Sequence, residues 1–203
     1  MAEEFDKQQA PAPDNQPEKK KARPGAALFE WLQMLIICIL SAVILFNCFA
    51  RLTRVDGSSM ENTLTHGELM WVWSLGYTPK QGDVVVLNKT TVPIPGWDGK
   101  LAIVKRVVAV GGQSVDIDYV SGTVYVDGNV LDEPYIKEEM SYPGNPYMEQ
   151  THWDIPEGSV FVMGDNRNNS TDSRDERVGP VDTGYILGKG VMALWPISKF
   201  GFM

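Results

Sequence analysis

Hydrophobic and polar positions divide the chain into three parts. Residues 1–24 are dense in charged residues, glutamine and proline and hold almost no large apolar residue. Residues 25–52 are almost continuously apolar, whereas residues 53–203 alternate short apolar runs with turn residues. A segment with the composition of residues 1–24 cannot bury a hydrophobic core, so we predict a disordered tail there.

The apolar segment predicts a membrane anchor. Its run from Leu32 to Ala50 matches the roughly 20 residues that cross the hydrocarbon core of a bilayer. Four cationic residues precede the run and two follow it: Lys19, Lys20, Lys21 and Arg23 against Arg51 and Arg54. By the positive-inside rule the tail is then cytoplasmic, and residues 53–203 lie outside the plasma membrane.

A cleaved signal peptide is the alternative for this segment, because Cys48 and Ala50 are small residues of the kind that precede a cleavage site. However, the run is longer than the roughly 7–15 residues of a signal-peptide apolar region, and no Gly or Pro breaks its end. We therefore predict a retained, single-pass anchor over residues 25–52.

Residues 53–203 show the pattern of an all-β domain. Short runs rich in Val, Ile, Tyr and Trp recur between turn residues, and no long helical period is present. The Asp127-Gly128 pair between two such runs predicts a two-residue hairpin. We predict a mainly β fold of coiled antiparallel sheets, a sandwich or partly open barrel, with one N-terminal transmembrane helix. The predicted strands are 68–75, 83–88, 102–110, 114–119, 123–131 and 159–164.

Charge and motif content exclude several classes of function. The formal net charge of −8 argues against nucleic acid as a partner, because phosphate binding needs a basic face. The sequence contains no Walker-type or dinucleotide-type glycine pattern. Residues 164–174 begin like a calcium loop at Asp165, but Ser170 stands where such a loop needs glycine. We therefore expect no metal and no cofactor.

Two adjacent serines, Ser58 and Ser59, are candidate nucleophiles, and a serine hydroxyl needs a base to take its proton. The candidate base is Lys105, in the middle of the predicted strand 102–110. Strand alternation gives this lysine three apolar neighbours on its face: Ile103, Val107 and Ala109. Desolvation among them disfavours the charged ammonium, and a neutral amine is a competent general base.

The alternative is a solvated lysine. If residues 102–110 formed an edge strand, the Lys105 head would lie in water and guard against aggregation. If Lys105 is buried instead, Arg106 on the opposite face is expected to be the exposed guard. The polar loop 164–174 adds two carboxylates and two guanidiniums, which an ordinary solvated loop would also carry: Asp165, Asp172, Arg167 and Arg174.

Taken together, these segments resemble a known family. SSMENTL (58–64), VKRVVAVGG (104–112) and GDNRNNSTDSR (164–174) are similar to three boxes of the bacterial type I signal peptidases. The segment GDVV (82–85) is similar to a further box, and ALWPISKFGFM (193–203) to the family's C-terminal end. The resemblance spans residues 27–203. It implies a membrane-bound serine endopeptidase of the short form, which removes signal peptides from exported preproteins.

The resemblance assigns roles residue by residue. The serine directly before methionine, Ser59, is the implied nucleophile, and the lysine of the Lys-Arg pair, Lys105, is the implied general base. Ser170 then helps to orient the lysine, while Asp172 and Arg174 brace the site. Acyl transfer through a serine ester is the implied chemistry.

The turn around the nucleophile departs from the family at two positions. The Ser59 backbone N–H, in the turn of Gly57, Ser58 and Ser59, is the first implied oxyanion donor. Some relatives have a serine where this chain has Gly57, so the second donor stays open between water and backbone. Asn62 stands where the family motif S-M-x-P-T-L has proline. Because asparagine tolerates turn geometry, we expect activity to survive.

The implied substrates are signal peptides with small residues at −1 and −3, bound as an added β-strand. Met60, Leu64 and Val104 are candidate walls of the substrate pocket. Trp71 and Trp73 share one face of a predicted strand, where they either pack in the core or enter the interface of the lipid bilayer. We expect a monomer that binds no nucleic acid.

Two other functions fit parts of the sequence. A tethered β-domain that binds a partner without catalysis would need neither a buried lysine nor a Ser-Met turn. A self-cleaving repressor-type protease shares Ser-Lys chemistry, but it would carry a DNA-binding domain where residues 1–52 carry a tail and a membrane span. The second of these is therefore discarded.

Overall fold

The computed structural model describes residues 25–88 and 103–202. The predicted tail, residues 1–24, lies outside the described residues, as does the first residue of the predicted strand 102–110.

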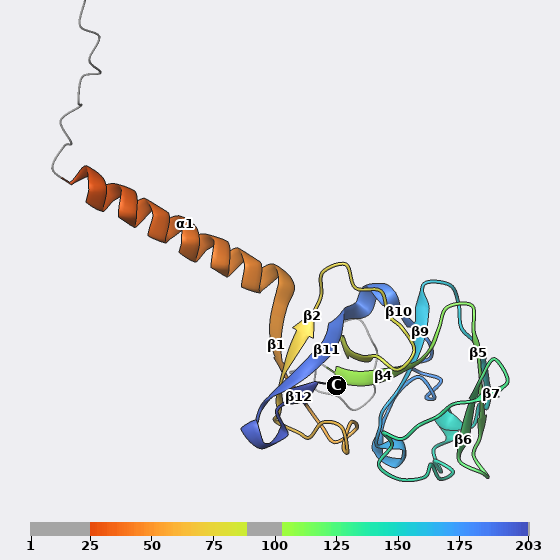
Figure 1. Cartoon of the computed structure of the whole chain (residues 1–203). Helices are drawn as coiled ribbons and strands as arrows, with labels where there is room; N and C mark the ends of the chain where they lie inside the picture. Colours follow the sequence, from red (N-terminus) through yellow and green to blue (C-terminus); the bar gives the residue numbers. More distant parts are fainter. Residues whose placement is uncertain (1–24, 89–102, 203) are drawn as a thin grey trace, which may run out of the picture. The chain divides into compact units, whose positions relative to one another are not determined.

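Helix α1 (Ala26–Phe49) is the single α-helix of the described chain, and Figure 1 shows it as one uninterrupted rod. Its window Ala27–Ile44 has a mean hydropathy of 2.2, so its length and composition suffice to cross a membrane. The helix ends three residues before the predicted boundary at residue 52. Residues 50–52 belong instead to the first strand, β1 (Ala50–Arg54).

The β-domain consists of two antiparallel sheets (Figure 1). The large sheet has the strand order β1-β2-β11-β3-β4-β9-β10, with β12 paired to β11, and the small sheet has the order β7-β6-β5-β8. The remaining strands are β2 (Leu69–Trp73), β3 (Val84–Leu87), β4 (Ile103–Val110), β5 (Ser114–Asp118), β6 (Thr123–Val126), β7 (Asn129–Val130), β8 (His152–Asp154), β9 (Ser159–Met163), β10 (Val181–Asp182), β11 (Ile186–Trp195) and β12 (Gly201–Phe202). The 3₁₀ turns are η1 (Pro146–Met148), η2 (Arg167–Asn169), η3 (Thr183–Tyr185) and η4 (Ile197–Lys199).

The predicted strands and the predicted hairpin are confirmed. All six predicted runs contain strand, and the run 123–131 is the hairpin of β6 and β7. Asp127 and Gly128 both have positive φ, 51° and 75°, between the paired residues Val126 and Asn129. Two positive φ angles are the signature of the type I′ turn that a two-residue hairpin favours.

Three hydrophobic clusters hold the β-domain together. One lies between the sheets, where Phe161 of the large sheet packs on Trp153 of the small sheet with ring centroids 4.9 Å apart. The other two lie on opposite faces of the large sheet, because alternate residues of β3 belong to different clusters. This double coverage explains why β3, Val84–Leu87, is buried at every position.

A bulge in β4 corrects one expected neighbour of Lys105. The pairing of β4 with β9 shifts between Val107 and Ala109, so the simple alternation breaks there. Ile103 and Val107 share one cluster, as predicted, whereas Ala109 packs together with Val108 in the cluster between the sheets.

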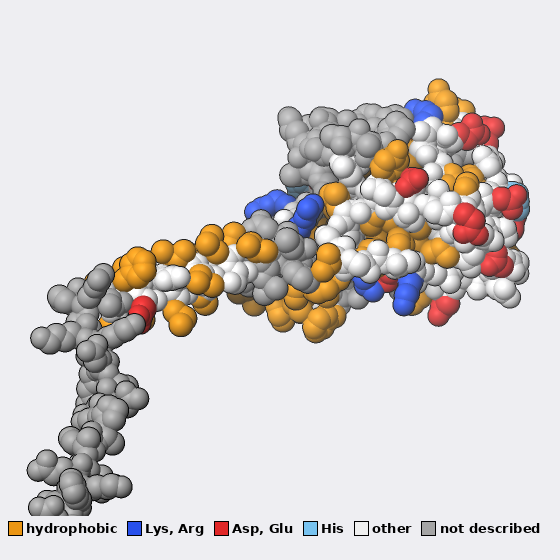
Figure 2. Space-filling view, turned by 90° about the horizontal axis from the view of Figure 1, so that it is seen from above, with side chains coloured by type: hydrophobic (Ala, Val, Ile, Leu, Met, Phe, Trp, Pro, Cys, Tyr) orange, Lys and Arg blue, Asp and Glu red, His pale blue; other side chains and the backbone are white. Residues whose placement is uncertain are grey.

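Large apolar side chains are exposed at one end of the large sheet. They lie on β1, β2, β11 and β12 and on the connection from β11 to β12: Leu52, Trp73, Trp195, Ile197, Phe200 and Phe202. These strands are neighbours in the sheet, so the side chains form one apolar margin. Figure 2 shows apolar side chains gathered on the surface of the β-domain as well as along α1.

Candidate active site

The first site segment, residues 58–64, forms two overlapping turns that leave Ser59 partly exposed. The Ser58 carbonyl accepts from the Glu61 N–H at 3.1 Å, and the Met60 carbonyl accepts from the Leu64 N–H at 2.7 Å. Met60 and Leu64 are buried in the hydrophobic cluster that also holds Val104. The buried side chains on either side anchor the turn and fix the position of Ser59.

Lys105 lies within hydrogen-bonding distance of this serine, with its Nζ 2.5 Å from Ser59 Oγ. It projects from β4, which is flanked by β3 and β9 and is therefore an inner strand rather than an edge. Its side chain is 3% exposed. Burial lowers the pKa of Lys105 to about 8, although the carboxylates of Asp172 and Asp165 act in the opposite direction. An amine with this pKa is partly neutral near physiological pH.

The third segment, residues 164–174, folds around a buried ion pair. Asp172 accepts from Arg174 Nε at 2.8 Å, from Ser170 Oγ at 2.6 Å and from the Gly164 N–H at 2.9 Å. Burial alone would raise the pKa of Asp172, but the Arg174 guanidinium and these hydrogen bonds together lower it. The pair therefore stays ionised next to Lys105.

The hydroxyl of Ser170, implied to orient the lysine, donates to Asp172 in this structure. Among the hydrogen bonds of the described residues, none joins Ser170 to Lys105. The two serines are nevertheless close neighbours across Gly164. A Cβ built on that glycine would stand 2.3 Å from Ser170 Oγ and 2.5 Å from the Ser59 carbonyl oxygen. Only glycine fits between them.

Arg106 corrects the expectation of an exposed guard next to Lys105. Its Nε and Nη2 donate to the two carboxylate oxygens of Asp165 at 2.9 and 2.7 Å, and its guanidinium is almost completely buried. Asp165 also accepts from Thr63 Oγ1 at 2.5 Å. This bidentate pair ties the strand of Lys105 to the turn of Ser59. The sequence reasoning missed it because alternation alone placed Arg106 on a solvent face.

Two further buried or polar contacts in this region were not foreseen. Arg167, in η2, pairs with Glu133, and both side chains are at least nine-tenths buried. The Asn166 N–H donates to the Ser59 carbonyl at 3.0 Å. The sequence did show a high density of Asp, Asn and Arg in residues 164–174. That density could not identify the residues outside the loop with which they pair.

Backbone N–H groups available for an oxyanion lie at Ser58 and Ser59. In the described part of the chain, neither of these N–H groups makes a hydrogen bond. The Gly57 N–H donates instead to His66 Nδ1 at 3.1 Å, and the glycine adopts a φ of 82°. The Ser58 hydroxyl oxygen accepts from Asn169 Nδ2 at 2.8 Å. The Gly57 N–H is therefore occupied in the structure, whereas the neighbouring Ser58 and Ser59 N–H groups are not.

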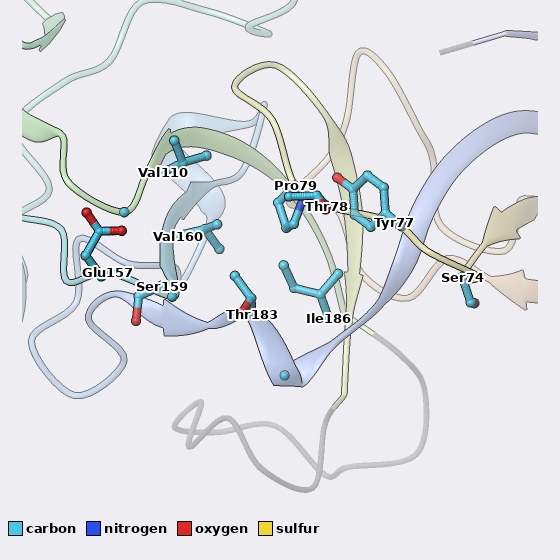
Figure 3. A pocket seen from close by; sticks show the side chains of 13 residues that line it. Ser74, Tyr77, Thr78, Pro79, Val110, Glu157, Ser159, Val160, Thr183 and Ile186 are labelled. Atoms are coloured by element: carbon cyan, nitrogen blue, oxygen red, sulfur yellow. The ribbon is translucent and has the colours of Figure 1, made fainter.

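The candidate pocket walls belong to one buried cluster. Met60, Leu64 and Val104 are each at most 1% exposed and belong to one cluster with Val55. A separate pocket of about 470 Å³ lies at the far end of β4, where Figure 3 shows Val110, Tyr77 and Thr183 around it. Ser59 and Lys105 do not line that pocket. Among the described residues, no group of three or more His, Cys, Asp or Glu side chains is placed to hold a metal ion.

Comparison with known proteins decides the family. The family described as "Signal peptidase, peptidase S26" matches residues 28–195, which is most of the chain. The chain belongs to the signal peptidase family. The resemblance of the three sequence boxes is thereby confirmed, and the apolar helix α1 fits a membrane-anchored enzyme of this family.

Curated signal peptidases match almost the whole chain. A probable signal peptidase I-1 of Synechocystis sp. is 33% identical over 182 residues, which cover 88% of each chain. A signal peptidase I of Bacillus licheniformis is 29% identical and covers 90% of this chain and 96% of its own length. A signal peptidase IB of Staphylococcus aureus is 30% identical and covers 86% and 93%.

A solved structure, that of a signal peptidase I from Enterococcus faecalis, also matches. It is 23% identical, covers 56% of this chain and 97% of its own, and superposes with a TM-score of 0.42.

Proposed function

We propose that this signal peptidase cleaves preproteins by acyl transfer, with Ser59 as the nucleophile and Lys105 as the general base. The observation that carries the proposal is the 2.5 Å approach of the buried Lys105 Nζ to Ser59 Oγ. Membership of a peptidase family supports it independently. Neither histidine is placed for this role, since His66 binds the Gly57 N–H and His152 binds Asp116 at the surface.

The first half of the reaction acylates the serine. Neutral Lys105 takes the proton of Ser59, and the serine oxygen attacks the scissile carbonyl carbon. The resulting oxyanion is stabilised by backbone N–H groups of Ser59 and Ser58, which are preorganised by the turn. The lysine ammonium then gives its proton to the leaving amine as the C–N bond breaks. An ester between Ser59 and the signal peptide remains.

The second half hydrolyses that ester. Lys105, neutral again, takes a proton from water, and the hydroxide attacks the ester carbonyl. The C–O bond to Ser59 breaks, and the serine oxygen recovers its proton from the lysine. The Asp172–Arg174 pair braces this cycle: it fixes the end of β9 against the nucleophile turn, and its carboxylate limits how far the pKa of Lys105 falls.

Two apolar regions of the β-domain support proposals for substrate selection and for membrane attachment. Met60, Leu64 and Val104 belong to one packed apolar cluster, and a site bordered by this cluster would accept only small residues at −1 and −3. The apolar margin that includes Trp73 and Phe202 would enter the interface of the bilayer. Trp71, on the same face as Trp73, is largely covered and serves mainly as packing. With the N-terminus cytoplasmic, the β-domain would work outside the plasma membrane.

The test is cleavage of a purified preprotein with an Ala-x-Ala site by the detergent-solubilised full chain. Wild type should cut at that site, whereas Ser59→Ala and Lys105→Met should lose activity by roughly 10⁴-fold or more. Ser58→Ala should retain cleavage within about tenfold, because it keeps the Ser58 backbone N–H and removes only the hydroxyl that accepts from Asn169. Wild-type rates in Ser59→Ala or Lys105→Met would reject the dyad. An inert wild type would favour a tethered binding domain.

A further inference from the structure

The residue that replaces the family's proline adopts a backbone conformation that proline cannot reach. Asn62 has a φ of 90°, and the Met60 carbonyl accepts from the Thr63 N–H at 3.1 Å across it. A four-residue turn with positive φ at its third position is of type II, for which Gly or Asn is preferred. The proline ring fixes φ near −65°. The nucleophile turn of this chain therefore cannot be held by a proline and needs another support.

That support comes from a segment about 75 residues further along the chain, Glu133–Lys137, here called the clamp segment. Asn62 Nδ2 donates to the backbone carbonyls of Tyr135 and Ile136 at 3.2 and 3.4 Å. One residue earlier in the turn, the Glu61 carboxylate binds Lys137 Nζ at 2.8 Å. Two consecutive side chains of the nucleophile turn thus bind the same short segment.

The clamp segment is itself fixed to the other two site segments. The Arg106 guanidinium lies over the Tyr135 ring, 4.0 Å from its centroid, and Arg106 is the residue next to Lys105. The Lys137 N–H donates to the Asp165 carbonyl at 2.9 Å. At its other end, Glu133 pairs with the buried Arg167. The segment therefore contacts the turn of the nucleophile, the strand of the base and the loop that braces both.

We propose that the clamp segment positions the nucleophile turn, and hence Ser59 Oγ relative to Lys105, through Asn62 and Glu61. The proposal rests on the dyad function proposed above and adds Asn62 to it as a positioning residue. Asn62 can influence the position of Ser59 because the two residues are only three positions apart and lie in two overlapping turns. A turn free to shift by an ångström loses the near-attack geometry and also lets water reach the lysine.

The decisive variants change Asn62 in two ways. Asn62→Gly keeps the positive φ without strain but removes both hydrogen bonds to the clamp segment. We expect the full-length enzyme in detergent to show a kcat lowered by roughly tenfold at an unchanged KM, since ground-state binding of the peptide is untouched. We also expect the midpoint of its pH–rate profile to move upward, because a hydrated Lys105 is more basic. Asn62→Pro restores the family residue and should lose more activity than Asn62→Gly.

Asn129→Gly is the matched control. Asn129, in the small sheet, also donates its amide to a backbone carbonyl, that of Asp127 at 3.2 Å. Its kcat, KM and pH midpoint should equal those of wild type. Circular dichroism of all variants checks that the fold is retained.

A second pair of changes tests the other contact. Lys137→Met should lower kcat several-fold, and adding Glu61→Gln to it should lower kcat little further, because both remove one ion pair. The clamp is overturned if Asn62→Gly keeps kcat within about twofold of wild type, if its whole loss lies in KM, or if Asn129→Gly loses as much. An inert wild type, or an active Ser59→Ala, would instead reject the underlying dyad, so the two failures are distinguishable.

Discussion

The small sheet and the catalytic half of the large sheet, here β4, β9 and the loop 164–175, bury different kinds of side chain. In the small sheet, apolar and polar residues alternate, with Val115 and Ile117 buried and Asp116 and Asp118 facing outward. Its ion pair, His152 with Asp116, lies at the surface. The catalytic half instead buries seven charged side chains in one region: Lys105, Arg106, Asp165, Arg167, Asp172, Arg174 and Asp175.

The difference shows what each half needs in order to fold. The small sheet is held by hydrophobic burial, which tolerates changes at its surface. The catalytic half must pair its buried arginines and carboxylates, because removing one partner leaves the other charge unpaired at a cost on the order of 3–5 kcal/mol. Pairing restricts the region to one arrangement of its backbone, and that arrangement brings Ser59 to Lys105.

The largest effect is expected from breaking the buried pair. Arg174→Met leaves Asp172 buried without its cation, so the free energy of unfolding should fall by about 3–5 kcal/mol. Urea denaturation of the detergent-solubilised chain measures it. Arg177→Met is the matched change, because Arg177 is 38% exposed and its partner, the buried Asp175, keeps the hydrogen bond from the Arg177 backbone N–H; it should cost less. Equal losses would contradict the special role given to the buried pair.

The next largest effect is the pH dependence of cleavage. The proposed base, Lys105, would act only when neutral, and its pKa lies at about 8, so the proposal predicts that kcat/KM rises about fiftyfold between pH 6 and pH 8. Above the pKa the rate should level off. Initial rates on one preprotein across this range measure it. A profile that is flat from pH 6 to pH 8 would show that the base is another group.

A smaller effect is expected from adding one methyl group at Gly164. Gly164→Ala places a Cβ against Ser170 Oγ and the Ser59 carbonyl, an overpacking that should cost about 1–3 kcal/mol and separate the turn from the loop. The loss in kcat/KM, expressed as a free energy, should therefore exceed the loss in the free energy of unfolding. Gly128→Ala, in the small-sheet hairpin, meets no atom within 4 Å and should cost stability only through its positive φ. An active Gly164→Ala enzyme would contradict this contact.

The smallest effect belongs to the surface pair of the small sheet. The hydrogen bond with Asp116 raises the pKa of His152, so the pair stabilises the fold when the histidine is protonated. That contribution should be present in acid and lost as the pH rises through the raised pKa, opposite in direction to the gain of activity. Comparing wild type with His152→Gln by urea denaturation at several pH values measures it. Cleavage at pH 8 should be the same in both.

Sequence patterns predicted the small sheet except for β8, and the catalytic half only in part. The strands at 114–119 and 123–131 follow from alternation and from Asp127-Gly128, which are local properties. Strand β11 was missed because Gly188 and Gly190 interrupt its apolar run. The structure explains the first of these glycines, since a Cβ at Gly188 would stand 2.4 Å from the Trp73 carbonyl. A close approach between strands distant in sequence leaves no local signal.

The same limit applies to the site. The motif resemblance identified Ser59 and Lys105, and the structure places them in contact. The partners of the buried charges came from elsewhere in the chain: Asp165 for Arg106, and Glu133 for Arg167. Alternation assigns a face to a residue but not a partner. Asn62 was expected only to be tolerated, and its bonds to the clamp segment became visible once the fold brought residues 62 and 135 together.

The contact at Gly164 also bears on how this chemistry could be transplanted. The third site segment touches the nucleophile turn through main-chain atoms, with the Asn166 N–H on the Ser59 carbonyl and a bare glycine beside it. Grafting a serine and a lysine onto another β scaffold would copy the side chains but not this contact between the two backbone segments. The smallest portable unit is therefore two loops in fixed register, and a pair of residues alone would be inert.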